Sequence, residues 1–118
     1  MSDFYDQEKD GSVEGHATVS SVKQGFTIHK FEINMLGGPT EIALPAMCKA
    51  LDVQTDEKTG LPAIWIELNP EHDKVKRLVL QVAVTGGQVP FGDWFGSFQM
   101  KDPSNNSNFV GHVYGHWA

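Results

Sequence analysis

The feature of this chain that most constrains its fold is a series of short segments in which apolar and polar residues alternate. Alternation places successive side chains on opposite faces of a strand, whereas a helix needs apolar residues every three or four positions. Gly, Pro, Asn and Asp punctuate the series about every ten residues. The alternating segments are 26–33, 40–44, 50–55, 63–68, 77–84, 94–100 and 109–117. The pattern predicts an all-β fold, either a small antiparallel sandwich or a partly open barrel of about seven strands.

The lengths of these segments and of their connections give further expectations. Because the connections are short, consecutive strands are expected to pair antiparallel. Segment 77–84 is rich in β-branched residues and has apolar side chains at both odd and even positions. This predicts a central strand with both faces covered. No internal repeat or composition break divides the body. The sequence therefore predicts a single β domain over residues 22–118.

Charge is unevenly distributed along the 118 residues, whose net charge is −6. The first fourteen residues hold a net charge of −4, from Asp3, Asp6, Glu8, Lys9, Asp10 and Glu14. This composition predicts an acidic, mobile N-terminal tail over 1–21 and a nearly neutral body. The overall acidity argues against a broad grip on nucleic acid or on an anionic membrane. A local basic contact stays compatible with Lys74, Lys76 and Arg77.

The reactive residue types form no recognisable catalytic pattern. Cys48 is the single cysteine, which excludes an internal disulfide and fits a reducing compartment. The neighbours of Cys48 match no nucleophile signature. Catalytic carboxylate pairs need a shared cleft, whereas the acids of this chain lie in the tail and the turns. No apolar run approaches the roughly 20 residues of a membrane span, and the acidic start does not resemble a signal peptide. We therefore expect a cytoplasmic protein with no catalytic residue and no cofactor.

The last alternating segment carries His112, Tyr114 and His116 on one face and Phe109, Val113 and Trp117 on the other. The second set is the better core. Two histidines four residues apart on a strand are separated by roughly 13 Å. One zinc ion holds two nitrogens only about 3–4 Å apart, since each bond is near 2 Å. The spacing therefore prevents His112 and His116 from sharing one ion. A site with one of them would need ligands from other strands, such as Cys48 or His29, and we predict no metal site.

A glycine-rich loop lies upstream of several aromatic residues. The loop lacks the Gly-Lys-Ser/Thr ending of a phosphate cradle, but exposed backbone N–H groups beside aromatic rings suit a flat ligand or a protein partner. Trp65 adds a further ring opposite an aliphatic row. The predicted ligand- or partner-binding residues are Trp65, Gly86, Gly87, Gln88, Phe91, Trp94, His112, Tyr114 and His116. The competing interpretation is that these rings fill a second layer of the β fold.

Several short segments occur in the order known from one protein family. They include 28–31 (IHKF), 42–45 (IALP), 51–54 (LDVQ), 60–65 (GLPAIW), 69–70 (NP), 77–80 (RLVL), 85–90 (TGGQVP), 96–99 (GSFQ) and 109–114 (FVGHVY). In this respect the sequence resembles a family of small proteins encoded by bacteriophages and prophages. The resemblance implies a phage origin and an all-β fold, and it carries over no functional residues.

Small accessory phage proteins that act inside the host are often non-catalytic binders, which is an argument by analogy. We therefore expect a binding protein that occupies a host defence or regulatory protein, or that sequesters a small nucleotide-like ligand. One alternative is a structural or assembly component of the phage particle, which would pair into a homo-oligomer through an exposed sheet edge. A second alternative is a metal-dependent enzyme.

Overall fold

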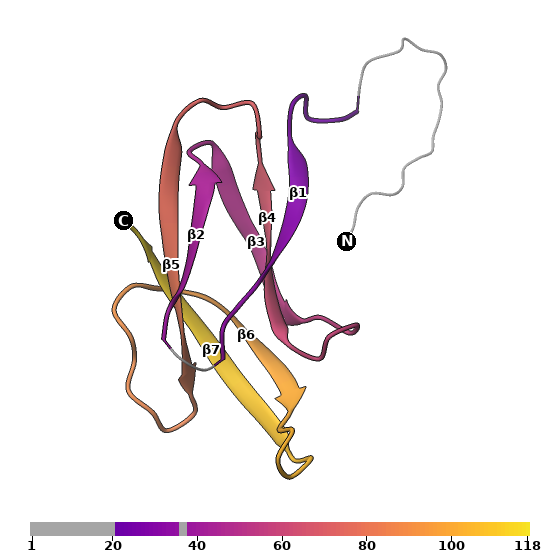
Figure 1. The fold of residues 1–118 in the computed structure, drawn as a ribbon, viewed down its shortest axis with the longest axis vertical. Helices are drawn as coiled ribbons and strands as arrows, with labels where there is room; N and C mark the ends of the chain where they lie inside the picture. The colour runs from indigo at the N-terminus through magenta and orange to yellow at the C-terminus, as the bar shows by residue number, and fades with distance from the viewer. Residues whose placement is uncertain (1–20, 36–37) are drawn as a thin grey trace.

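The computed structural model describes residues 21–35 and 38–118, which form seven strands and no helix (Figure 1). The predicted acidic tail lies almost wholly outside the described residues. β1, β4 and β3 form one sheet in that order, and β2, β5, β7 and β6 form the other, with every pair antiparallel. The strands are β1 (Thr27–Glu32), β2 (Thr40–Pro45), β3 (Cys48–Thr55), β4 (Pro62–Leu68), β5 (Val75–Val84), β6 (Asp93–Lys101) and β7 (Asn108–Trp117).

The two sheets pack face to face, which confirms the all-β prediction and makes the fold a sandwich rather than a closed barrel. Alternation turns one face of each sheet inward, as expected for strands that are apolar at every second position. The core therefore takes side chains from both sheets. The buried ones are Ile42, Leu44, Leu78, Leu80, Phe98 and Val113 from the larger sheet, and Val53, Ile64, Ile66 and Leu68 from the smaller.

The expectation that consecutive strands pair is wrong for most connections. It holds for the hairpins β3–β4 and β6–β7. The chain instead changes sheets between β1 and β2, between β2 and β3, and between β4 and β5, because a two-layer fold needs crossings between its layers. β5 and β6 flank β7 and both run antiparallel to it, so they are parallel to each other and the loop 85–92 must cross β7.

Two expectations about individual strands need correction. β5 is central in its sheet, as predicted, but its outward face is not covered, since Gln81 is exposed there. On β7, Val113 is buried and Phe109 packs against the core, as predicted. Trp117 is 41% exposed instead, because it lies at the end of the strand, where the Lys76 ammonium group sits 3.9 Å from the ring centroid.

One side of the sandwich is closed by contact between its two sheets. β3 and β6 are edge strands of different sheets, and the Thr55 hydroxyl group donates a hydrogen bond to the Gln99 carbonyl oxygen between them. A Cβ atom added to Gly96 would lie only 2.8 Å from the Cβ atom of Val53, so this approach of the backbones requires glycine. β1 and β2 are the other edge strands within the described residues.

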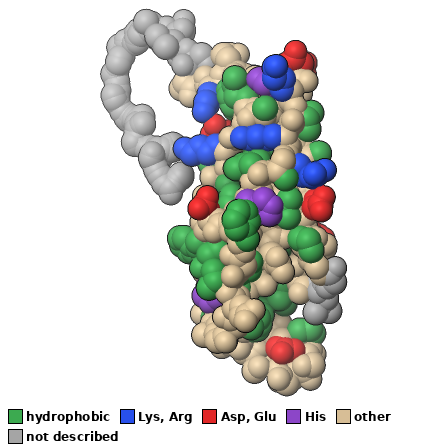
Figure 2. Space-filling model, turned by 90° about the vertical axis from the view of Figure 1, so that its left-hand side faces the viewer, with side chains coloured by type: hydrophobic (Ala, Val, Ile, Leu, Met, Phe, Trp, Pro, Cys, Tyr) green, Lys and Arg blue, Asp and Glu red, His purple; other side chains and the backbone are tan. Residues whose placement is uncertain are grey.

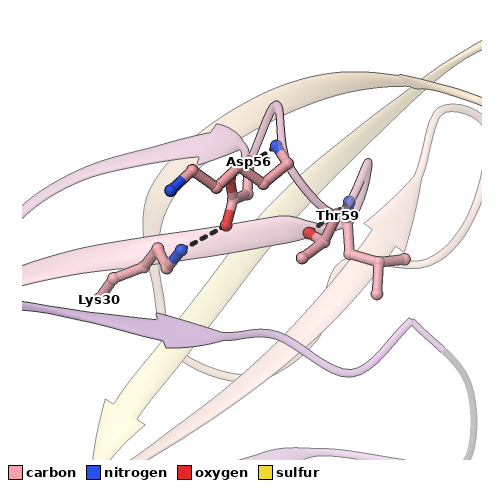
Figure 3. Close-up of polar contacts among 5 residues, drawn as sticks. Lys30, Asp56 and Thr59 are labelled. Carbon is pink, nitrogen blue, oxygen red and sulfur yellow. Dashed lines mark hydrogen bonds and ion pairs between the residues drawn. The ribbon is translucent and has the colours of Figure 1, made fainter.

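The β3–β4 loop is held by side-chain contacts as well as by the hairpin (Figure 3). The Asp56 carboxylate accepts hydrogen bonds from the Lys30 ammonium group at 2.5 Å and from the Lys58 N–H group at 3.0 Å. The Thr59 hydroxyl oxygen accepts one from the Leu61 N–H group at 3.2 Å. These contacts tie β1 to the β3–β4 hairpin at one end of the smaller sheet.

Candidate binding surface

The outward face of the larger sheet carries a group of rings that we call the aromatic face. On β7, the residues between the rings turn toward the core, so His112, Tyr114 and His116 share the outward face, as predicted. The rings that complete the group belong to β6 and to the loop before it. The aromatic face consists of Phe91, Trp94, His112, Tyr114 and His116.

A β-bulge in β6 places Trp94 on this face. Residues three apart on a regular strand point to opposite sides, yet Trp94 and Ser97 lie opposite Tyr114 and His112, respectively. The register shifts between Trp94 and Gly96, and the extra residue, Phe95, packs against the core. The bulge thus turns one aromatic side chain inward while keeping its neighbour outward.

A chain of hydrogen bonds orients the rings of the aromatic face. The Trp94 indole N–H group donates to the Ser97 hydroxyl oxygen at 3.2 Å, and this oxygen lies 2.8 Å from Nδ1 of His112. Nε2 of His112 lies 3.1 Å from the Thr85 hydroxyl oxygen. These hydrogen bonds therefore connect β6, β7 and the end of β5. They hold the Trp94 and His112 side chains in place without a bound partner.

The loop 85–92 contributes the most exposed ring. It begins with a turn in which the Gly87 N–H group donates to the Val84 carbonyl oxygen at 2.9 Å, and Gly86, Gly87 and Gln88 are all exposed. After the loop has crossed β7, the Phe91 ring meets His116 edge to face, with 5.0 Å between centroids. Phe91 is nevertheless 82% exposed and Trp94 is 60% exposed. Figure 2 shows hydrophobic side chains beside a histidine in the middle of this side of the molecule, and Lys and Arg mainly above them.

The structure separates Trp65 from the other predicted site residues. Trp65 lies on β4, where its cross-strand neighbours are Lys30 and Asp52. It points away from the aliphatic row of β4, as predicted, but this is the outward face of the smaller sheet, on the other side of the sandwich. The sequence prediction omitted Ser97 and Thr85. Ser97 gave no local signal, because only the bulge brings it onto the same face as Trp94.

Other features of the described residues lie away from the aromatic face. Two adjoining hollows share Leu61, Met100 and Pro103 and lie beside the β3–β4 and β6–β7 loops. Within residues 21–35 and 38–118, no three His, Cys, Asp or Glu side chains are grouped as metal ligands would be. The same part of the chain contains no helix long and apolar enough to span a membrane.

Fold and surface together define a two-layer β-sandwich protein with an open aromatic sheet face. The chain belongs to the family described as "Domain of unknown function (DUF7352)", whose model matches residues 25–118 and so includes all seven strands. No curated protein and no solved structure matched the chain.

Proposed function

We propose that this protein is a non-catalytic binding protein whose aromatic face contacts a protein of the host cell, in the host cytoplasm. The observation that carries the proposal is the exposure of Phe91 and Trp94 on a face whose rings are already oriented. Large aromatic side chains dominate the binding energy of protein interfaces, because they bury much apolar area at a small entropic cost. The sequence resemblance to phage proteins supports a host protein as the partner.

The shape of the surface favours a macromolecule over a small nucleotide-like ligand. Small-molecule sites are concave and enclose most of the ligand. The aromatic face instead spans β6, β7 and the crossing loop, and the two hollows lie elsewhere. None of the five residues of the aromatic face is Lys or Arg, the side chains that most often bind a phosphate group.

The contact between Ser97 and His112 invites a comparison with nucleophilic catalysis. In hydrolytic triads, a carboxylate group orients the imidazole and stabilises its charged form. Here the group at the far nitrogen is the neutral Thr85 hydroxyl, and Ser97 also accepts the Trp94 N–H group. This arrangement supports a role for these hydrogen bonds in positioning the Trp94 and His112 rings rather than in catalysis.

The proposal is tested by affinity capture from a bacterial host lysate, with mass spectrometry of proteins and small molecules. We expect Trp94→Ala to weaken capture of the partner protein by about 30-fold or more, which corresponds to the loss of about 2 kcal/mol at a hot spot. The matched control is Trp65→Ala, which removes the same side chain from the opposite side of the sandwich. Circular dichroism checks that both variants fold.

Three outcomes would contradict the proposal. Capture that survives the double change Phe91→Ala and Trp94→Ala would place the partner elsewhere. Recovery of a small molecule alone would favour the sequestration alternative. Recovery of the chain in purified phage particles would favour a structural role.

A further inference from the structure

We infer that the segment recognised by the aromatic face is a proline-rich segment in the polyproline II conformation. The inference rests on the proposed function and specifies the chemistry of its partner. Polyproline II is a preformed extended helix, so a segment in this conformation loses little conformational entropy on binding. Aromatic surfaces recognise it because the flat faces of the proline rings pack against aromatic side chains.

The first argument is the placement of two rings at directly opposed positions. Trp94 on β6 is the cross-strand partner of Tyr114 on β7. Directly opposed side chains in an antiparallel pair have Cβ atoms about 4.5–5.5 Å apart. Two adjacent rings of this kind give the apolar flanks that a pyrrolidine ring packs against, and the bond from Trp94 to Ser97 holds one of them in position.

The second argument is the spacing to the next pair of rings, Phe91 and His116. His116 lies two residues beyond Tyr114, or roughly 6.6 Å along β7, and adjacent strands are about 4.8 Å apart. The diagonal from Trp94 to His116 is therefore roughly 8 Å at the backbone. Polyproline II rises about 3.1 Å per residue with three residues per turn, which gives a repeat of about 9 Å. Successive turns of one segment can thus meet the two ring pairs.

The third argument is the polarity of the face. A polyproline II backbone makes no internal hydrogen bonds, so its carbonyl groups seek donors. The indole N–H group of Trp94 and the Tyr114 hydroxyl group are donors that stand among the rings. The Trp94 N–H group already donates to Ser97, so the Tyr114 hydroxyl group is the donor that can bond to a carbonyl group of the partner. An uncharged, acceptor-rich segment fits this face better than an acidic or basic one.

Other modes of peptide binding fit this surface less well. Addition of a strand needs an open sheet edge, but the outer edge of β6 lies against β3, where Thr55 donates to the Gln99 carbonyl group. Docking of an amphipathic helix needs an apolar groove, and the hollows lie beside the hairpin loops. The occupant that remains is an extended segment lying over β6 and β7 along the line from Trp94 to His116.

The experiment titrates the full chain with a decaproline peptide and follows the indole N–H and backbone signals by NMR. We expect saturable shifts of the Trp94 indole signal and of Tyr114 and His116. Affinity should fall at least tenfold in Trp94→Ala and in Tyr114→Leu, and it should be unchanged in Trp65→Phe. A flexible Gly-Ser peptide of equal length is the matched ligand control and should produce no saturable shift.

The outcomes separate this inference from the proposed function. If decaproline produces no saturable shift while Trp94→Ala still abolishes capture of the host protein, the inference is overturned and the proposed function stands. Equal binding of the Gly-Ser peptide, or shifts confined to the 56–61 and 102–107 loops, would also overturn it. If capture of the host protein survives loss of the rings, the proposed function itself fails.

Discussion

Asp56 is the residue at which the β3–β4 loop and the edge strand β1 are joined. It is 7% exposed, and its carboxylate accepts hydrogen bonds from the Lys30 ammonium group and from the Lys58 N–H group. These donors favour the charged carboxylate and hold its pKa below the ordinary value. Folding and the ionisation of this single group are therefore coupled.

The coupling predicts how stability depends on pH. Because the pKa of Asp56 is lowered in the folded state, its contribution is complete above the unfolded-state pKa, near 4, and is lost as the pH falls through the lower folded-state pKa. We expect Asp56→Asn to lower the urea midpoint at pH 7 and to reduce the loss of stability between pH 5 and pH 2.5. Glu57→Gln, which removes an exposed neighbouring carboxylate, should leave the acid dependence close to that of the natural chain. An unchanged acid dependence in Asp56→Asn would contradict the assignment.

Among the strands, β6 shows best what sequence patterns reveal and what they do not. Alternation and turn residues are local properties, so they located all seven strands and placed His112, Tyr114 and His116 on one face. The bulge at Phe95 breaks the alternation, and it decides that Trp94 and Ser97 lie together. Gly96 inside the strand is compatible with a bulge, but it does not show which neighbouring side chain turns inward. Of the four hydrogen-bonded residues, the sequence therefore predicts Trp94 and His112 but not Ser97 and Thr85.

The close approach of β6 to β3 beside the bulge depends on the absence of a side chain at Gly96. We expect Gly96→Ala to destabilise the protein by about 1–3 kcal/mol, as overpacking does in a close-packed interior, because its Cβ atom would press against Val53. Urea unfolding measures the change, and the Trp94 indole signal should move with it. Gln99→Ala, an exposed change on the same strand, is the control and should stay within about 0.5 kcal/mol. A Gly96→Ala protein as stable as this control would show that β6 and β3 are not in close contact.

For the whole molecule, the pairing of strands and the assignment of strands to sheets are non-local, and this is where sequence reasoning failed. Trp65 and Trp94 both lie in alternating segments, and nothing near either residue shows that their strands belong to different sheets. The same limit explains the wrong expectation that consecutive strands pair. The local pattern is equally compatible with a sandwich and a barrel for this reason.

Burial between the sheets predicts which isoleucines support the fold. Ile66 on β4 is fully buried, whereas Ile28 on the neighbouring β1 is 60% exposed. We expect Ile66→Ala to cost about 2–5 kcal/mol, since it removes core contacts and leaves a cavity. The same change at Ile28 should cost less than about 0.5 kcal/mol. Denaturant titration of both variants gives the comparison, and equal losses would mean that the two sheets do not pack as described.

The position of β7 has a consequence for how the chain acquires its structure during synthesis. The larger sheet has β7 between β5 and β6, so without β7 it consists of the pair β2–β5 and a separate β6. A nascent chain that has not yet released residues 108–117 from the ribosome therefore lacks the strand that joins the larger sheet together. His112, Tyr114 and His116 belong to that strand. The joining of β6 to the rest of the larger sheet and the completion of the aromatic face therefore both require β7.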